Sequence, residues 1–327
     1  MNWERNCIRL CAGVLVLSAM CRMTADGLFA PVGQMLRSPE AVSFFFWLHT
    51  GRMVRTTAPE PGPPEETVSV TPAREPQQLT FSPEEGLLPE ITYACAARPD
   101  VEALLAQRLD WSLPDGTAPA VLILHSHTTE AYTPDGADTY EASSPYRTLD
   151  EHQNMLCLGA LVARRLEEAG IGVIHDRTLH DYPDYNSAYG NSADSIGEIL
   201  ADNPSIRLIL DLHRDAAETA YGQMVTECSI GAQRAAQLMI VVGTGEAGQE
   251  NPGWEENLSL GLKLQVLLER ENPGICRPLR LSQYRYNQHL GDKALLIEIG
   301  AAGNTLREAE LAAEALARAV IRLKNGI

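Results

Sequence analysis

Ionisable side chains follow or interrupt three apolar runs of this sequence. The triplet His-Ser-His at 125–127 follows the first run, and Asp-Leu-His-Arg-Asp at 211–215 ends the second. Glu298 lies inside the third. Imidazole nitrogens and carboxylates are ligands that zinc takes in hydrolytic sites, where three protein ligands leave one position for water. A further carboxylate outside the ligand shell would accept the proton of that water.

Each histidine or carboxylate also has a purely structural interpretation. His125 by itself is typical of a histidine at a strand end that bonds to backbone. The pair of His125 and His127 is harder to explain in this way, because a spacing of two residues puts both rings on one face of an extended segment. Glu298 stands among apolar residues, where a carboxylate needs a partner or a function. The pattern therefore favours a metal site.

The second motif leaves several roles open. Asp211 alternates with His213 and could orient its ring. Arg214 and Asp215 could form an ordinary surface ion pair. All four residues would stand at the carboxyl end of a strand.

Two other hydrolase chemistries fit the first motif less well. Ser126 lacks the Gly-x-Ser-x-Gly turn that presents a serine nucleophile. His-x-His also begins the metallo-β-lactamase signature His-x-His-x-Asp-His. Thr129 and Glu130 stand where that signature needs Asp and His, which excludes it.

Strands and helices alternate along the last two-thirds of the chain. Short apolar runs predict buried strands, and apolar residues at helical spacing predict helices. Strands are expected at 121–124, 171–174, 206–212, 238–242 and 294–297, and helices at 154–169, 187–202, 254–271 and from Thr305 onward. This order predicts an α/β fold with a mostly parallel sheet flanked by helices. Since such sheets bind ligands at the carboxyl ends of their strands, we expect the three motifs to meet at one edge.

The first 52 residues have the features of a membrane anchor. Arg5 and Arg9 precede an apolar run at 10–21, and Arg22 closes it. The run is shorter than the ~20 residues of a comfortable transmembrane helix and matches a signal-peptide core or a short anchor. It lacks a small residue before a persuasive cleavage point. We therefore expect an uncleaved anchor with the rest of the chain outside the cytoplasm.

Composition divides the remainder of the chain. Residues 53–90 are rich in Pro and Glu, which predicts an extended linker, and residues 91–327 are expected to form one hydrolase domain. The whole chain has 327 residues, with 43 Asp and Glu against 26 Lys and Arg, a net charge of −17. This acid excess argues against a nucleic-acid partner, because phosphates are bound by Lys and Arg.

Four segments, in order, resemble the motifs of the stage II sporulation protein P family. They are VLILHSHTTEAYTP at 121–134, DLHRDA at 211–216, the Val-Gly, Asn-Pro, Trp and Asn positions within 242–257, and YNQHL with LLIEIG and Asn-Thr within 286–305. The resemblance covers about residues 91–325, and the two histidine motifs together are its most specific part. His289 departs from the pattern, since Asp is more usual there.

The resemblance implies a zinc-dependent peptidoglycan hydrolase of endospore-forming bacteria. Its fold would be similar to that of N-acetylmuramoyl-L-alanine amidases, and it would cut the amide between N-acetylmuramic acid and L-alanine. Peptide cross-links would be a second target. The family acts in engulfment of the forespore alongside sporulation proteins D and M. The alternative is a non-catalytic wall-binding or scaffold protein on the same fold, which would usually have lost one site residue.

The resemblance also implies roles for the histidines. His213 would be a metal ligand. From the first motif, His127 is preferred to His125 as a ligand because it lies beyond the strand, where the amidases place theirs.

The carboxylates take their roles from the same resemblance. The amidases take a third ligand a few residues before an Asn at the start of the next helix, which makes Asp150, four residues before Asn154, the candidate. Glu130 and Glu151 are the alternatives. Glu298 matches the catalytic glutamate, the base toward zinc-bound water and then the acid toward the leaving amine.

Overall fold

The computed structural model of the chain describes residues 88–325, except 110, 111, 115, 117, 137, 138 and 221. The predicted anchor at 1–52 and nearly all of the predicted linker at 53–90 lie outside the described residues. Among the helices of the described part, none combines the length and the apolar character that crossing a membrane requires.

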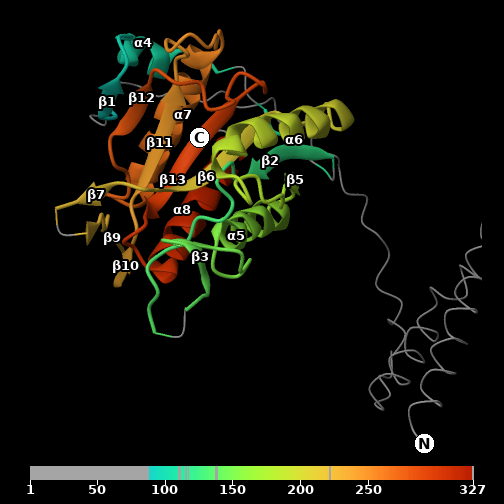
Figure 1. Ribbon diagram of the computed structural model, residues 1–327. Coiled ribbons are helices and arrows are strands. Elements are labelled where there is room, and N and C mark those ends of the chain that lie inside the picture. Colours follow the sequence, from blue (N-terminus) through green and yellow to red (C-terminus); the bar gives the residue numbers. More distant parts are fainter. Residues whose placement is uncertain are drawn as a thin grey trace, which may run out of the picture. The chain divides into compact units, whose positions relative to one another are not determined.

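Seven strands form the central sheet, in the order β1-β12-β11-β13-β6-β2-β5 (Figure 1). Their bounds are β1 (Ile91–Ala94), β12 (Leu279–Ser282), β11 (Leu238–Gly243), β13 (Ala294–Ala301), β6 (Leu208–Asp215), β2 (Pro119–Leu124) and β5 (Gly172–His175). Every neighbouring pair is parallel except β11 and β13. The predicted mostly parallel sheet is confirmed, and the carboxyl ends of β13, β6, β2 and β5 share one edge.

Alternate residues of the strands face different helices. Five helices accompany the sheet: α4 (Val101–Ala106), α5 (Met155–Glu168), α6 (Ala188–Asp202), α7 (Trp254–Glu271) and α8 (Leu306–Asn325). Val121 and Ile123 belong to the large apolar core with α4, α5, α7 and α8. Leu122 and Leu124 belong to a smaller cluster with Ile196 of α6. This two-residue alternation is the geometry of a strand buried on both faces.

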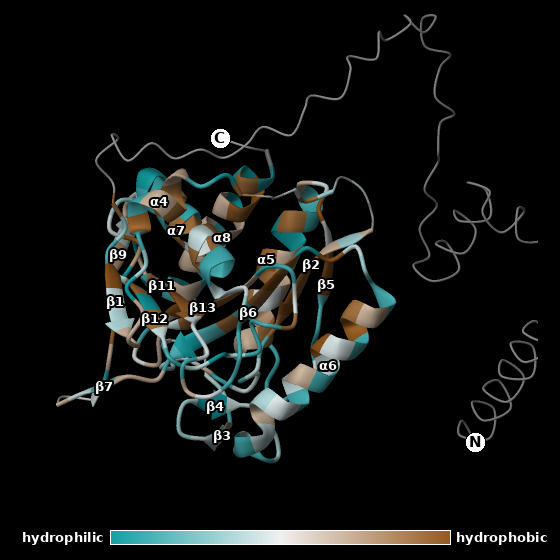
Figure 2. Ribbon diagram, turned by 90° about the horizontal axis from the view of Figure 1, so that it is seen from above, coloured by the Kyte–Doolittle hydropathy of each residue, from teal (hydrophilic) through white to brown (hydrophobic). Residues whose placement is uncertain are grey.

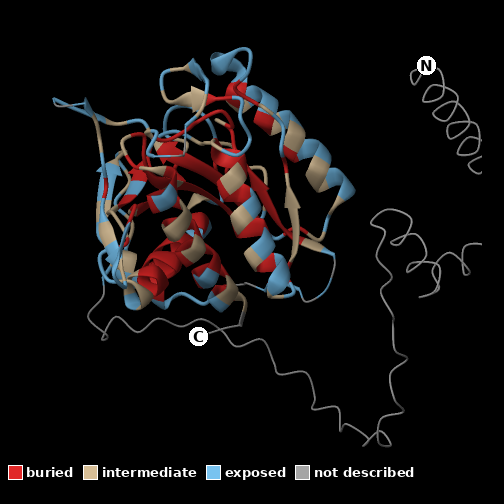
Figure 3. Ribbon diagram, turned by 90° about the horizontal axis from the view of Figure 1, so that it is seen from below, coloured by how far each residue is buried: buried red, intermediate tan, exposed pale blue. Residues whose placement is uncertain are grey.

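The helix α6 covers its face of the sheet incompletely. Its buried residues are Ala188, Ser192 and Ile196, and the rest of its surface is exposed or partly exposed (Figure 3). Apolar and polar residues alternate along its length, whereas the strands behind it are strongly apolar (Figure 2). The amino-terminal half of α6 lies beside the residues that follow β2, because the Ser192 and Ser126 hydroxyls share a hydrogen bond of 2.9 Å.

Helix ends follow the signals in the sequence. The Asn154 side chain accepts a hydrogen bond from the Leu156 amide and caps α5. Thr305 and Glu308 exchange side chain to backbone hydrogen bonds of 3.3 and 3.1 Å, which is the predicted capping box of α8. These two helices pack on the sheet face opposite α6, and their caps set where the loops after β2 and β13 end.

Short elements between the main ones were not predicted. They are the hairpins β3 (Ala142–Ser144) with β4 (Arg147–Thr148), β7 (Glu218–Thr219) with β8 (Gly222–Gln223), and β9 (Cys228–Ile230) with β10 (Gln233–Ala235), and the 3₁₀ turn η2 (Tyr185–Ser187). The strands β1 and β12 were also missed, because Thr92 in the first and Arg280 in the second interrupt the apolar run. The hairpin β3–β4 and the turn η2 both contribute to the site described next.

Candidate active site

The carboxyl ends of β2, β6 and β13 bring the three sequence motifs together, as expected. Glu298 of β13 and His213 of β6 are partners in the parallel register. The rings of His127 and His213 lie edge to face with centroids 5.5 Å apart. Glu130, in the turn after β2, places Oε2 3.6 Å from His213 Nδ1. Two histidines and two glutamates thus share one edge of the sheet.

His213 is held between two carboxylates. Its Nε2 lies 2.8 Å from Asp211 Oδ1, although no well-directed hydrogen bond joins the two atoms. Asp211 is fixed in turn by Ser126, whose amide and hydroxyl donate to it at 2.8 and 2.7 Å. Burial lowers the pKa of His213, but Asp211 and Glu130 outweigh it and hold that pKa well above its usual range. Asp211 therefore orients His213, and Ser126 supports Asp211.

Glu130 is a buried carboxylate surrounded by cations. The Arg214 amide donates to Oε2 at 3.2 Å, and the Arg214 guanidinium lies 3.7 Å from Oε1. Burial raises the pKa of Glu130, but Arg214 and His213 lower it by more, so the pKa falls to about 2. Glu130 is therefore ionised across the physiological pH range.

The alternative of a surface ion pair between Arg214 and Asp215 is wrong. Arg214 is buried and its guanidinium donates to the carbonyls of Ala131 and Tyr146 at 2.7 Å each. Asp215 pairs instead with Arg277 at 2.7 Å. Successive residues of a strand point to opposite faces, so these two side chains cannot meet.

His127 sits in an aromatic and acidic setting that sequence reasoning missed. Its ring stacks on Tyr185 at 4.4 Å and meets Tyr189 edge-on at 5.5 Å. Its Nδ1 lies 3.9 Å from Asp181 Oδ2. The Arg147 guanidinium lies over the Tyr185 ring, 4.2 Å from its centroid. No spacing signal could have found these residues, because they come from the β3–β4 hairpin, from the segment between β5 and α6, and from the first turn of α6.

Glu298 has the environment of an acid–base group. Its Oε2 is a buried atom with no hydrogen-bond partner. Burial, which His213 opposes and Glu130 reinforces, raises the pKa of this carboxyl to about 8. A carboxyl that titrates near neutral pH can both accept and return a proton.

His125 does not face this edge of the sheet. It points to the opposite face, where Nδ1 lies 2.9 Å from the Leu212 carbonyl and Nε2 lies 2.9 Å from His175 Nε2. The ring is fully buried beneath Gly159 of α5. Both nitrogens of His125 have partners, whereas His127 Nδ1 has no hydrogen-bond partner. The expected shared face fails because the strand ends at Leu124 and a turn follows.

The structure does not bring Asp150 to the other site residues. Asp150 is exposed, and its carboxylate accepts a hydrogen bond from the His152 amide. Glu151 is exposed as well and pairs with Arg177. Glu130, one of the two alternatives to Asp150, is the carboxylate that stands beside His213. Only folding of the turn after β2 could show this, since Glu130 is three residues from His127 and reaches His213 across strands.

The donor atoms near His213 suit a zinc ion. In the part of the chain that the structure describes, no three His, Cys, Asp or Glu residues already form a complete metal group. His127 Nδ1 is nevertheless a buried atom without a hydrogen-bond partner, and His213, whose Nε2 faces Asp211, turns its Nδ1 toward Glu130. The 3.6 Å between His213 Nδ1 and Glu130 Oε2 is close to the roughly 3.4 Å that separates two ligands of one tetrahedral zinc. His127, Glu130 and His213 therefore fit the implied metal.

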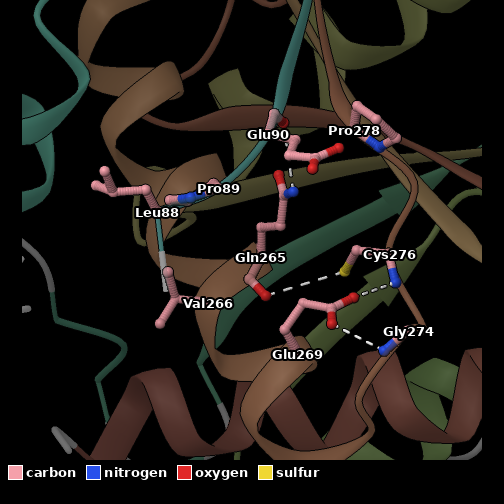
Figure 4. A pocket seen from close by; sticks show the side chains of 9 residues that line it. All are labelled: Leu88, Pro89, Glu90, Gln265, Val266, Glu269, Gly274, Cys276 and Pro278. Carbon is pink, nitrogen blue, oxygen red and sulfur yellow. Dashed lines mark hydrogen bonds between the residues drawn. The ribbon is translucent and has the colours of Figure 1, made fainter. Parts of the chain in front are cut away.

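A separate cavity of about 280 Å³ lies away from these residues (Figure 4). It opens between the start of β1 and the end of α7, where Glu269 accepts hydrogen bonds from the amides of Gly274 and Cys276. None of the strand-end histidines or glutamates lines it.

Comparisons with known proteins identify the family that the sequence motifs resemble. Residues 75–321 match the family model of stage II sporulation protein P. Stage II sporulation protein P of Bacillus subtilis (strain 168) is 28% identical over 213 residues, which make up 62% of this chain and 50% of that protein. The chain thus spans about half the length of the curated relative that it matches.

Solved structures of amidases are similar over a comparable part of the chain. The N-acetylmuramoyl-L-alanine amidase AmiC2 of Nostoc punctiforme has a TM-score of 0.38 and 13% identity, and covers 63% of this chain and 98% of its own. An N-acetylmuramoyl-L-alanine amidase from Clostridium difficile 630 has a TM-score of 0.36 and 15% identity, with 63% and 96% covered.

Proposed function

Since this chain belongs to the stage II sporulation protein P family, we propose that it is a zinc-dependent peptidoglycan hydrolase. It would cleave the amide between N-acetylmuramic acid and L-alanine. The observation that supports this most strongly is the meeting of His127, Glu130 and His213 with the partnerless carboxyl of Glu298. Metal ligands beside one carboxyl of raised pKa are the groups that amide hydrolysis needs, because the metal activates water and the carboxyl transfers its proton.

In this proposal His127, Glu130 and His213 hold the metal. A bound zinc ion would supply a coordinated water of lowered pKa and would polarise the amide carbonyl. Glu298 takes the proton of the attacking water and delivers it to the nitrogen of the leaving amine. Its pKa near neutrality suits both transfers. Glu130 replaces Asp150 as the third ligand, because Asp150 is exposed and committed to the His152 amide.

Outer residues hold the ligands in place. Asp211 is 2.8 Å from His213 Nε2, and the Tyr185 ring stacks on the His127 ring. Arg214 balances the Glu130 charge from beneath, and Arg147 lies between the Asp181 and Glu130 carboxylates at 3.8 and 4.0 Å. Partners of this kind set the ring orientation and basicity of metal ligands.

The cellular setting is also a proposal. The basic and apolar segment at 1–52 supports an anchor in the cytoplasmic membrane, and the Pro- and Glu-rich segment at 53–90 supports a spacer that keeps the hydrolase outside it. Family membership supports action during forespore engulfment, with sporulation proteins D and M as partners. Cleavage of peptide cross-links would be a second activity of the same site.

The test is hydrolysis of purified peptidoglycan by the purified full chain. With zinc the protein should release soluble wall fragments, and a chelator should stop the release until zinc is restored. Mass spectrometry then separates the two activities, because amidase action exposes the amino group of L-alanine and endopeptidase action exposes an amine within the cross-link. Activity that survives Glu298→Gln would contradict the proposed mechanism. So would a protein that, with zinc present, binds the wall without releasing soluble fragments. The second result is the one expected of a non-catalytic scaffold.

A further inference from the structure

A tyrosine-lined pocket lies next to His127, because Tyr189 both lines the pocket and contacts the His127 ring. Its volume is about 390 Å³, and it is lined by Tyr189, Gln249, Tyr284, Arg285, Tyr286 and Asn287. The rings form a continuous series, with centroids 5.5 Å apart from His127 to Tyr189, 6.0 Å from Tyr189 to Tyr286 and 6.2 Å from Tyr286 to Tyr284. The pocket is therefore an extension of the proposed active site.

The segment that carries the pocket is held in an uncommon conformation. Tyr286 and Asn287 have φ angles of 50° and 58°, and a bulky aromatic residue rarely occupies this left-handed region. Tyr286 shares a hydrogen bond of 2.9 Å with the Ser282 hydroxyl. The side-chain amide of Asn287 donates to the Tyr189 carbonyl at 2.8 Å. Backbone conformations of this cost persist where the surroundings enforce them and are concentrated at functional sites.

The neighbouring residue Gln288 fixes the same segment to the sheet. Its side chain accepts from the Gly243 amide and donates to the Val241 carbonyl, both at 2.8 Å. A Cβ on Gly243 would lie 2.1 Å from the Tyr284 carbonyl oxygen, so the segment lies directly against β11. The pocket is thus a rigid surface and does not depend on a freely moving loop.

Arg285 is the cation of this pocket. Its guanidinium has no hydrogen bond or carboxylate partner among the residues that the structure describes, and the side chain is half-buried. In a chain with a net charge of −17, a half-buried guanidinium without a counter-ion is a local exception. Arginine presents a planar fork of donors that matches a carboxylate.

We propose that this pocket binds the anionic peptide stem of peptidoglycan, with Arg285 pairing with a stem carboxylate and the tyrosine rings covering the peptide backbone. The inference rests on the proposed function. It adds that the peptide part of the substrate, and not the sugar part, lies in this pocket. Sugars and peptides both stack on tyrosine. The glycan strand is neutral while its lactyl group is bound as an amide, whereas the stem peptide carries free carboxylates. A single unpaired guanidinium therefore selects the peptide.

The experiment compares two disaccharide-peptides, one with free stem carboxylates and one with those carboxylates amidated. The full chain is tested as wild type, as Arg285→Gln and as Arg164→Gln, a control that removes an exposed arginine of α5. Arg285→Gln should raise KM for the free-carboxylate substrate roughly 10- to 100-fold with little change in kcat. It should leave KM for the amidated substrate nearly unchanged, and Arg164→Gln should change neither.

Binding is measured separately from turnover, by titration calorimetry with the same compounds and with a peptide-free glycan. If the wild type binds the disaccharide-peptides but does not hydrolyse them, the proposed function is wrong. The pocket proposal is then tested by the binding affinities alone. The proposal is overturned if Arg285→Gln weakens the free and amidated compounds equally, or if it weakens the peptide-free glycan, which would assign the pocket to sugar. Unchanged zinc content and thermal midpoint establish that the variant is folded.

Discussion

Glu298 and Glu130 show how two carboxyls at one site are driven apart in pKa. Glu130 lies against the Arg214 guanidinium, and its pKa falls to about 2. Glu298 has a partnerless buried oxygen, and burial raises its pKa to about 8. One carboxyl therefore stays ionised as a ligand should, and the other can exchange protons. Environments that separate the pKa values of neighbouring acids identify their roles.

Glu298 should weaken the metal-free fold as pH rises. Its pKa is raised on folding, so the unfolded chain loses the proton first and stability falls from about pH 4.5 to about pH 8. Glu298→Gln should remove the contribution of this carboxyl to the slope and raise the free energy of unfolding by about 1–3 kcal/mol at pH 8. Urea unfolding of zinc-depleted protein at several pH values measures it, with the exposed Glu198→Gln as control. Equal slopes in wild type and Glu298→Gln would contradict this account.

The choice of third ligand can be decided by a matched pair of variants. Glu130→Gln keeps the shape of the side chain but removes the charge beside His213, and zinc affinity should fall by about 100-fold or more. Asp150→Asn removes a charge from an exposed residue and should leave zinc content unchanged. Zinc is quantified after dialysis against buffered metal. Loss of zinc in Asp150→Asn with retention in Glu130→Gln would restore the assignment from the sequence.

At the scale of elements, α5 is shaped around a buried histidine pair. A Cβ on Gly159 would lie 2.4 Å from Nε2 of both His125 and His175. The glycine lets α5 approach β2 and β5 closely enough to cover these rings. His125 thus has a packing role on the face of the sheet opposite the active site, and the His-x-His spacing divides its two rings between the two faces.

Gly159→Ala should destabilise the protein, although alanine is intrinsically the better helix former. Helix propensity alone favours alanine by about 1 kcal/mol. The clash with both rings should reverse that sign and cost about 1–3 kcal/mol. Gly197→Ala is the matched control, because a Cβ there meets nothing within 4 Å and should stabilise α6. Chemical denaturation of both variants measures the difference, and a gain at both positions would show that α5 can move away.

For the whole molecule, the proposed metal would connect parts that are distant in sequence. His127 and Glu130 come after β2, and His213 is in β6, more than eighty residues later. A ligand that binds only the folded chain stabilises it by an amount set by its concentration and affinity. Zinc should therefore raise the thermal midpoint as well as restore activity.

The size of that effect can be stated. At a free zinc concentration 100 times Kd, the gain is about 2.7 kcal/mol, or roughly 5–10 °C for a domain of this size. Differential scanning fluorimetry with chelator and then with zinc measures it. Glu130→Gln should lose most of the shift. A midpoint that does not respond to zinc in the wild type would contradict the ligand set.

The sequence alone determined the main strands and helices, because apolar periodicity and capping residues act over a few neighbours. It also determined that His127, His213 and Glu298 lie at one edge, because the carboxyl ends of parallel strands meet there. Three features became visible only in the folded chain: His125 faces away, Glu130 and not Asp150 stands beside His213, and Asp181, Arg147 and the tyrosine pocket surround the site. Those relations depend on how turns and loops fold back across strands, and no local spacing encodes contacts between segments so far apart in the chain.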